Sequence, residues 1–121
     1  STSRGLGDVY KRQTRNFMTL CFSHPSVVGI QFWGFWEGNI FRPPTALFRE
    51  DWSEKPNGTV YRELVFNEWW TKEHGKTDKN GSFTTSAFFG EYDIIVSLKG
   101  KLTQTSFILT RDSDTCLIKL N

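Results

Sequence analysis

The stretch VVGIQFW, residues 27–33, decides the predicted fold. It is a nearly continuous apolar run of strand length, rich in β-branched and aromatic residues, which is typical of a strand buried on both faces in a parallel sheet. Ahead of it, residues 17–22 are rich in apolar side chains. Ser23-His24-Pro25 then stops this helical pattern, because the residue before a proline is pushed out of the helical region. The tail of a helix, a turn and a buried strand together indicate an α/β unit.

A long loop and a second helix follow the predicted strand. Residues 34–54 carry two glycines, a Pro43-Pro44 pair and alternating aromatic and charged residues, which predicts a loop. Lys55-Pro56 opens the helix, because the missing N–H of proline has no intrahelical partner in the first turn. Apolar residues then recur at helical spacing and form one stripe for a core: Val60, Tyr61, Leu64, Val65 and Trp69.

The second half of the chain, residues 71–121, has a period of two, with turn signals at short intervals. Asn80-Gly81 and Lys99-Gly100 are hairpin signals, because glycine adopts positive φ without steric cost. We therefore expect an antiparallel β-sandwich of about five strands. The clearest strands are predicted over residues 82–88, 92–98, 101–110 and 115–120.

Residues 1–13, STSRGLGDVYKRQ, show neither the helical nor the strand period, and they lack the apolar run of a signal peptide. The segment GDVYKRQ looks like a translated adapter sequence, so we exclude residues 1–13 from the fold prediction as a non-native tail. The predicted organisation is then a tail over 1–13, the end of an α/β domain over 14–70 and a β-sandwich over 71–121. The predicted fold class of the whole chain is α+β.

Composition and charge exclude several classes of function. The 121 residues are 37% hydrophobic and 16% aromatic, and the formal net charge is +2, with Lys and Arg scattered among the acids. No basic stripe is present for nucleic acid, and the apolar runs are far shorter than the roughly 18 residues that cross a membrane. Cys21 and Cys116 lack metal-ligand spacing, so we expect two free buried thiols, no metal and no cofactor.

Several motifs resemble the eighth strand, loop and helix of family 10 glycoside hydrolases. They are HPSVVGI from His24, FWGFWE from Phe32, Arg42, and Lys55-Pro56 ahead of Tyr61 and Leu64. The resemblance covers roughly residues 14–70 and implies the last β/α unit of a (β/α)8 TIM barrel. It also implies an endo-1,4-β-xylanase as the parent protein, with xylan as its partner, a retaining mechanism and an extracellular location.

The same resemblance implies sugar-binding residues in the loop. Trp33 matches the tryptophan that closes over the sugar nearest the cleavage point, and Phe41 stands where a second tryptophan is usual, followed by Arg42. A flat aromatic ring offers the C–H face of a sugar a large contact area at small entropic cost. Without the resemblance, a tryptophan at the end of a buried strand is more often a packing residue. The other tryptophans are assigned mainly to packing: Trp36, Trp52, Trp69 and Trp70.

The catalytic carboxylates of the family have no counterpart in this chain. Retaining glycosidases need two carboxyl groups about 5 to 5.5 Å apart, one as nucleophile and one as acid and then base. The family carries them on its fourth and seventh strands. Glu37 aligns with an acidic position of the loop and is a candidate substrate-binding residue, but a lone carboxylate cannot fill both roles. We therefore predict no catalytic residue and an inactive fragment.

The second half resembles immunoglobulin-like, carboxypeptidase-regulatory-like accessory domains, through GKTD from Gly75, GSF from Gly81 and GEY from Gly90. That pattern implies a fold and leaves a spacer and a sugar-binding role both open. For the whole chain the first hypothesis is a fragment of a glycoside hydrolase that degrades xylan. The alternative, from another class, is a non-catalytic carbohydrate-binding or structural β-sandwich module.

Overall fold

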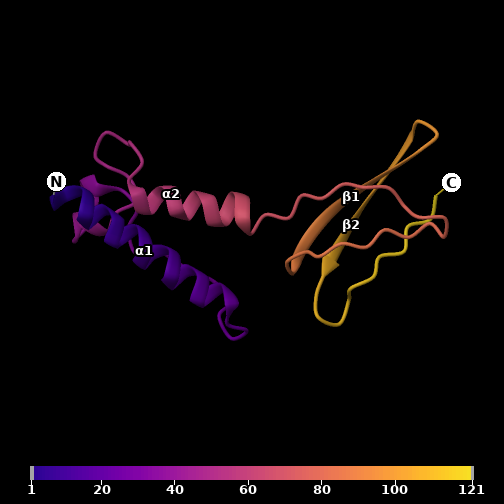
Figure 1. The fold of residues 1–121 in the computed structure, drawn as a ribbon, viewed down its shortest axis with the longest axis horizontal. Helices are drawn as coiled ribbons and strands as arrows, with labels where there is room; N and C mark the ends of the chain where they lie inside the picture. The colour runs from indigo at the N-terminus through magenta and orange to yellow at the C-terminus, as the bar shows by residue number, and fades with distance from the viewer. Residues whose placement is uncertain (1, 121) are drawn as a thin grey trace. The chain divides into compact units, whose positions relative to one another are not determined.

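The computed structural model describes residues 2–120 of the chain, with side chains from residue 5 onward. The chain divides into two compact units, Ser1–Trp70 and Thr71–Asn121 (Figure 1). The first unit is helical and the second is built on an antiparallel hairpin. The coarse prediction of an α+β chain is therefore confirmed.

Helix α1, Thr2–Ser23, spans 22 residues and contains the predicted helix tail over residues 17–22. Its residues 2–13 are helical although their sequence shows no apolar period. The physical reason is that small and amphipathic residues, rather than large apolar ones, face the rest of the unit in this segment. Gly7, for example, lies close to the start of the second α-helix, because a Cβ added to it would be in van der Waals contact with Pro56 Cγ at 3.5 Å. Buried and half-buried positions recur along one side of the helix: Gly7, Tyr10, Thr14, Met18 and Cys21.

Helix α2, Pro56–Glu63, begins where the Lys-Pro pair predicts it. Lys55 is the N-cap residue with extended backbone, φ −86° and ψ 163°, and Pro56 occupies the first turn. The helix continues as a π-helical turn over Leu64–Glu68, which Trp69 closes by donating its backbone N–H to the Leu64 carbonyl at 2.8 Å.

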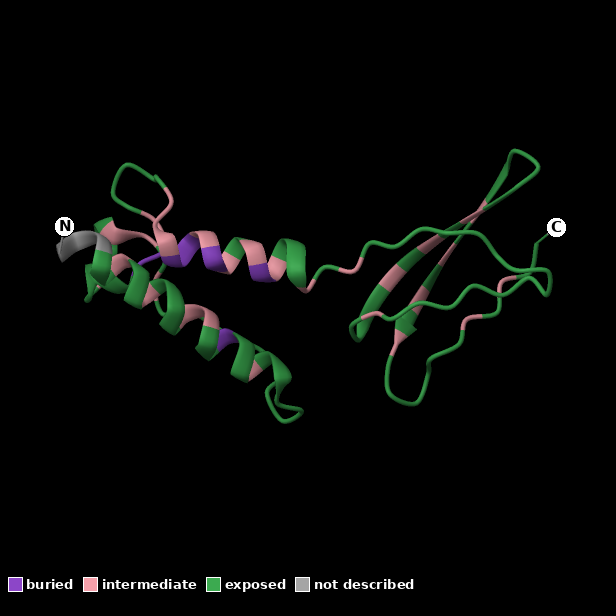
Figure 2. Ribbon diagram, in the orientation of Figure 1, coloured by how far each residue is buried: buried purple, intermediate pink, exposed green. Residues whose placement is uncertain are grey.

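The predicted apolar stripe of α2 forms the core of the first unit. Met18 of α1 clusters with Val60 and Leu64, and none of the three is more than 2% exposed (Figure 2). Partly buried side chains pack around them: Ile30, Phe32, Tyr61, Val65 and Trp69. At the surface, Arg15 of α1 donates to both carboxylate oxygens of Glu68, at 3.0 and 3.2 Å. Arg15 Nη2 also pairs with Glu63 at 3.2 Å. Apolar packing and these two ion pairs therefore join α1 to α2 and its π-helical continuation.

The prediction of a buried strand over residues 27–33 is wrong for this structure, in which the segment pairs with no strand among the described residues. Val28 and Trp33 are 102% and 97% exposed, whereas Ile30 and Phe32 pack against the core. A buried strand of a parallel sheet needs neighbours on both edges and cover on both faces. The described part of the chain supplies neither, so the segment packs through alternate side chains only.

The predicted loop over residues 34–54 is confirmed. Its only regular elements are two 3₁₀ turns, Glu37–Asn39 and Pro43–Thr45, within the part of the chain that the structure describes. Phe48 makes isolated β-bridges with residues on either side of it, and Leu47 is buried. These bridges bring distant parts of the loop together ahead of α2.

The second unit is built on a two-stranded antiparallel sheet, β1 (Gly90–Leu98) and β2 (Lys101–Leu109). All nine residues of each strand are paired. The connection is the predicted turn, in which Lys99 and Gly100 both have positive φ, 50° and 78°. Positive φ at both central residues is the type I′ geometry that suits the twist of a hairpin.

Two further predicted strands, residues 82–88 and 115–120, lie outside the sheet. The described residues therefore contain a two-stranded sheet where a sandwich of about five strands was expected. At Phe88 a side chain takes the place of a strand partner, because its backbone N–H donates to Thr71 Oγ1 at 3.3 Å. The predicted Asn-Gly turn does form, with Gly81 at φ 77°.

Candidate functional site

Trp33 and Phe41 present almost fully exposed rings, 97% and 89%, on two backbone segments that pass each other. A Cβ added to Gly34 would lie 3.0 Å from Ile40 Cδ1, so these segments are in van der Waals contact. Gly34 follows Trp33, and Ile40 precedes Phe41. The two rings predicted to hold sugar therefore leave neighbouring segments, and neither of them packs in the core.

Glu37 lies beside Lys55, the N-cap residue of α2. Glu37 Oε1 is 3.4 Å from Lys55 Nζ, and the lysine side chain is only 14% exposed. The same ammonium donates to the carbonyl oxygens of Pro43 and Pro44, at 3.0 and 3.4 Å. Lys55 thus ties both 3₁₀ turns to the start of α2, and the Glu37 carboxylate balances a largely buried positive charge.

Arg42 follows Phe41 and precedes the second 3₁₀ turn. Its carbonyl oxygen accepts from the backbone N–H and the hydroxyl of Thr45, at 3.0 and 2.8 Å, which fixes the backbone. Its exposed guanidinium makes no hydrogen bond or ion pair within residues 2–120, so its five N–H donors are available. Flat apolar rings, free donors and one paired carboxylate suit the binding of a hydroxyl-rich ring, but they do not provide the two carboxylates of a glycosidase.

A second aromatic cluster lies in the same loop, where the sequence predicted packing. Trp36 and Trp52 stack with their ring centroids 5.3 Å apart and their planes at 10°. Trp36 Nε1–H donates to the Glu50 carbonyl at 3.1 Å, and its ring is half-buried. Trp52, in contrast, is 58% exposed, so packing does not account for its outer face.

Trp52 also has an unusual backbone, with φ 66°. The left-handed region is disfavoured for a bulky residue, at a cost on the order of 1–3 kcal/mol. Hydrogen bonds hold it there: the Trp52 N–H donates to the Arg49 carbonyl at 2.9 Å, and Asp51 Oδ1 accepts from the N–H and hydroxyl of Ser53 at 2.9 and 2.6 Å. The hydroxyl bond and then the N–H bond lower the pKa of Asp51. The Asp-x-Ser spacing is the sequence signal for this turn.

Glu54 connects the end of the loop to α2. Its carboxylate accepts from Arg62 Nε and Nη2 at 2.9 and 3.0 Å, and from Thr59 Oγ1 at 2.5 Å. The hydrogen bonds from Arg62, then that from Thr59 and the positive charge of Arg62, lower the pKa of Glu54 to about 2 from its ordinary value of 4.5.

We expect this clamp to make the stability of the first unit sensitive to acid. Because the folded pKa of Glu54 is depressed, its contribution is present above pH 4.5 and is lost as the pH falls towards about 2. Thermal unfolding by circular dichroism should show wild type more stable than Glu54→Gln at pH 7, with the difference in Tm shrinking through that window. Glu50→Gln, in the same unit and at an exposed position whose carboxylate has no hydrogen-bond or ion-pair partner among residues 5–120, is the control. A difference that is independent of pH would contradict the assignment.

The remaining features of the described residues are a pocket, the helices and the two cysteines. A pocket of about 270 Å³ lies between α1 and the segment around Phe32, and no carboxylate, imidazole or thiol lines it. Within residues 2–120 no three His, Cys, Asp or Glu side chains come together as a metal site, and no helix has the length and apolar character to span a membrane. Cys21 and Cys116 are half-buried, where the sequence predicted buried thiols.

Comparison with known proteins gives distant relatives. No family model matches the chain. Over 97 residues it is 40% identical to the anti-sigma-I factor RsgI6 of Acetivibrio thermocellus, covering 78% of this chain and 13% of that protein.

Two plant enzymes match over a similar part of the chain. Endo-1,4-beta-xylanase 3 of Arabidopsis thaliana is 26% identical over 100 residues, 83% of this chain and 13% of that protein. Endo-1,4-beta-xylanase 1 of the same plant is 30% identical over 94 residues, 76% of this chain and 10% of that protein. The chain therefore spans only 10% to 13% of the length of these three relatives, and it has a distant, xylanase-like relationship to the two plant proteins.

Proposed function

We propose that the chain is a substrate-binding portion of a polysaccharide-degrading glycoside hydrolase, with an endo-1,4-β-xylanase of retaining mechanism as the parent protein. The observation that carries this proposal is the pair of exposed rings, Trp33 and Phe41, on contacting backbone segments. The distant identity with two proteins named endo-1,4-beta-xylanase supports xylan as the polysaccharide. Covering such rings with the C–H face of a sugar removes apolar surface from water, which is favourable.

In this proposal residues 14–70 are the last β/α unit of a family 10 (β/α)8 barrel. The order of an extended segment, a long loop and α2 supports this assignment. The exposed side chain of Val28 would be covered by the neighbouring strands of the parent. Substrate in barrel enzymes binds at the loops that follow the strands, which is the place of Trp33 and Phe41 here.

The remaining parts of the chain have proposed roles too. Residues 1–13 are a non-native tail, and residues 71–121 are an immunoglobulin-like accessory domain, supported by the hairpin of β1 and β2. The extracellular location belongs to the parent enzyme.

Each loop residue has its own proposed role. Trp33 stacks on the sugar nearest the cleavage point, and Phe41 adds an apolar platform that lacks the N–H donor of an indole. Arg42 donates to sugar hydroxyls, and Glu37 accepts from one through the carboxylate oxygen that does not face Lys55. The chain contributes binding, and the catalytic carboxylates belong to the part of the parent outside it.

We expect Trp33→Ala to weaken the binding of xylohexaose or soluble xylan by about tenfold, because a stacked aromatic ring and its buried area contribute on the order of 1–2 kcal/mol. Isothermal titration or affinity electrophoresis of the whole chain measures this change. Trp70→Ala, which removes another exposed indole of the same unit, is the matched control and should leave binding unchanged. Equal losses in the two variants, or none in either, would contradict the site.

One observation favours the non-catalytic alternative, a carbohydrate-binding or structural β-sandwich module. The relative with 40% identity is named an anti-sigma-I factor rather than a hydrolase. If the accessory half binds sugar, Phe89→Ala in the second unit would weaken xylan binding, whereas Trp33→Ala would not. That pair of results would select the alternative.

A further inference from the structure

The Trp52 ring stacks on the Trp36 ring, with centroids 5.3 Å apart, and Trp52 is otherwise largely exposed to solvent. The backbone of Gly38 lies so close to the Trp36 ring that a Cβ added at Gly38 would overlap it. Trp36 therefore contacts both Gly38 and Trp52, and the absence of a side chain at Gly38 leaves room for the Trp36 ring. The Phe48 ring also lies near Trp52, with centroids 6.3 Å apart, and the part of the indole that these rings do not cover, its open face, leaves Trp52 58% exposed.

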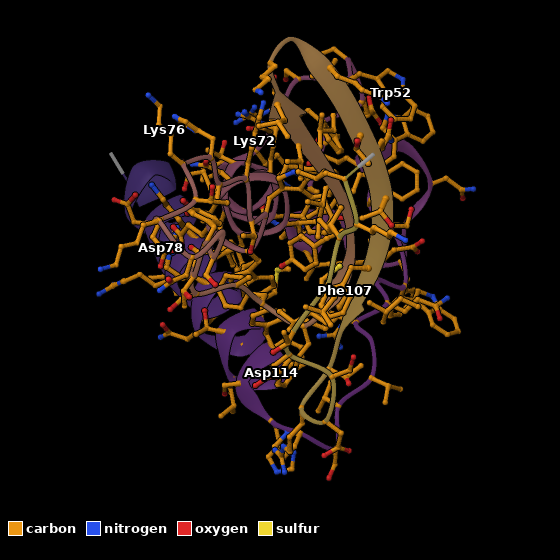
Figure 3. All side chains as sticks on the ribbon, turned by 90° about the vertical axis from the view of Figure 1, so that its right-hand side faces the viewer. Trp52, Lys72, Lys76, Asp78, Phe107 and Asp114 are labelled. Atoms are coloured by element: carbon orange, nitrogen blue, oxygen red, sulfur yellow. The ribbon has the colours of Figure 1, made fainter. Side chains whose placement is uncertain are left out.

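The surroundings of this face are fixed. The loop that carries Trp52 projects beside the start of α2 (Figure 1), and its tip, residues 49–53, is exposed (Figure 2). Arg49 Nη1 donates to Ser53 Oγ at 3.3 Å and to the Glu54 carbonyl at 2.9 Å, which braces the loop. Phe35, half-exposed, lies with its ring centroid 6.3 Å from that of Trp52, and Figure 3 labels Trp52 among the aromatic side chains of this region.

We propose that the open face of Trp52, flanked by Phe35, is a second stacking surface for a sugar ring of the polysaccharide. The inference rests on the proposed function and adds a contact outside the set of Trp33, Phe41, Arg42 and Glu37. A bulky residue held at positive φ by several hydrogen bonds is a position where backbone strain is maintained by its surroundings, and such positions concentrate at functional sites.

The neighbours of Trp52 identify the class of ligand. Glu50 and Asp51 precede it in the chain and are exposed, and the one cation of this turn, Arg49, has its Nη1 bonded to Ser53 and to the Glu54 carbonyl. Carboxylates accept hydrogen bonds from hydroxyl groups, whereas they repel anionic polymers such as nucleic acids or polyuronates. The core of a protein–protein interface is depleted of such charges. A neutral, hydroxyl-rich ring with an apolar face satisfies both the indole and the carboxylates.

The test compares two substitutions in the whole chain. Trp52→Asn removes the ring but suits the backbone, because asparagine is among the residues most often found at positive φ. We expect it to retain or raise the Tm while lowering the association constant for xylohexaose about fivefold or more. Trp52→Tyr keeps an aromatic face and should stay within about twofold of wild type.

The outcomes separate this inference from the proposed function. Unchanged binding in Trp52→Asn beside a loss in Trp33→Ala overturns the Trp52 surface alone. A loss in Trp52→Asn beside unchanged binding in Trp33→Ala supports the Trp52 surface and overturns the Trp33 site. If size-exclusion chromatography shows that Trp52→Asn changes the oligomeric state, a second copy of the chain covers this face and the sugar assignment is wrong.

Discussion

The purified chain should release no reducing sugar from xylan, and no aryl group from an aryl xylobioside, above the background rate. General acid–base catalysis typically contributes about 10² to 10⁴ in rate, and a retaining mechanism also needs its own nucleophile. Glu37 has Lys55 Nζ at 3.4 Å from its carboxylate, not a second carboxylate. Without the acid/base carboxylate and the nucleophilic carboxylate, the retaining mechanism cannot operate at all.

Glu37→Ala is the control for this experiment. Any turnover by wild type that disappears in Glu37→Ala would show that Glu37 is catalytic and that the assignment of the acid and nucleophile to the parent is mistaken. Turnover that survives in Glu37→Ala would point to a contaminating hydrolase, and repeating the assay on protein from an independent purification separates that case.

Gly58→Ala should destabilise the first unit by about 2 kcal/mol, although glycine to alanine inside a helix ordinarily stabilises by roughly 0.5–1 kcal/mol. An added Cβ at Gly58 would lie 2.5 Å from the Leu47 carbonyl oxygen. That oxygen accepts from the Lys55 N–H at 2.9 Å, so moving it weakens the junction that starts α2. Overpacking of this kind costs about 1–3 kcal/mol, and a lost hydrogen bond adds to it.

Urea unfolding followed by tryptophan fluorescence measures the change in the free energy of unfolding. Gly5→Ala in α1 is the matched control, because an added Cβ there meets no atom within 4 Å, so it should leave stability unchanged or raise it slightly. If Gly58→Ala were as stable as wild type, the close approach of Leu47 to α2 would be wrong.

The fold was predictable where the signal is local. Helix α2 follows from the Lys55-Pro56 start and from apolar residues at helical spacing, and the β1–β2 hairpin follows from Lys99-Gly100 between alternating residues. The prediction of a buried strand over residues 27–33 is wrong because an apolar run forms a buried strand only if other strands lie beside it. Such neighbouring strands are distant in the sequence, so the residue types at 27–33 do not show whether they are present.

The candidate site was likewise predictable only where its signal is local in the sequence. An aromatic-rich loop between the two helical segments is visible in the sequence, as are Trp33 and Phe41. The pairing of Glu37 with Lys55 joins residues 18 positions apart, and it depends on how the intervening turns fold. The exposure of Trp52 depends on its stack with Trp36 and on a positive φ, and neither is encoded in residue type alone.

The π-helical turn over Leu64–Glu68 has a consequence for how this segment can vary in length. An inserted residue would rotate everything after it in an α-helix by about 100°. A π-helical turn instead accommodates the extra residue within one wider turn. Here that turn exposes Phe66 and Asn67 to solvent, and Trp69 after it still packs against the core. Related chains with and without that extra residue can therefore share one core. An insertion or deletion at this point should appear among them as a neutral difference rather than as a change of fold.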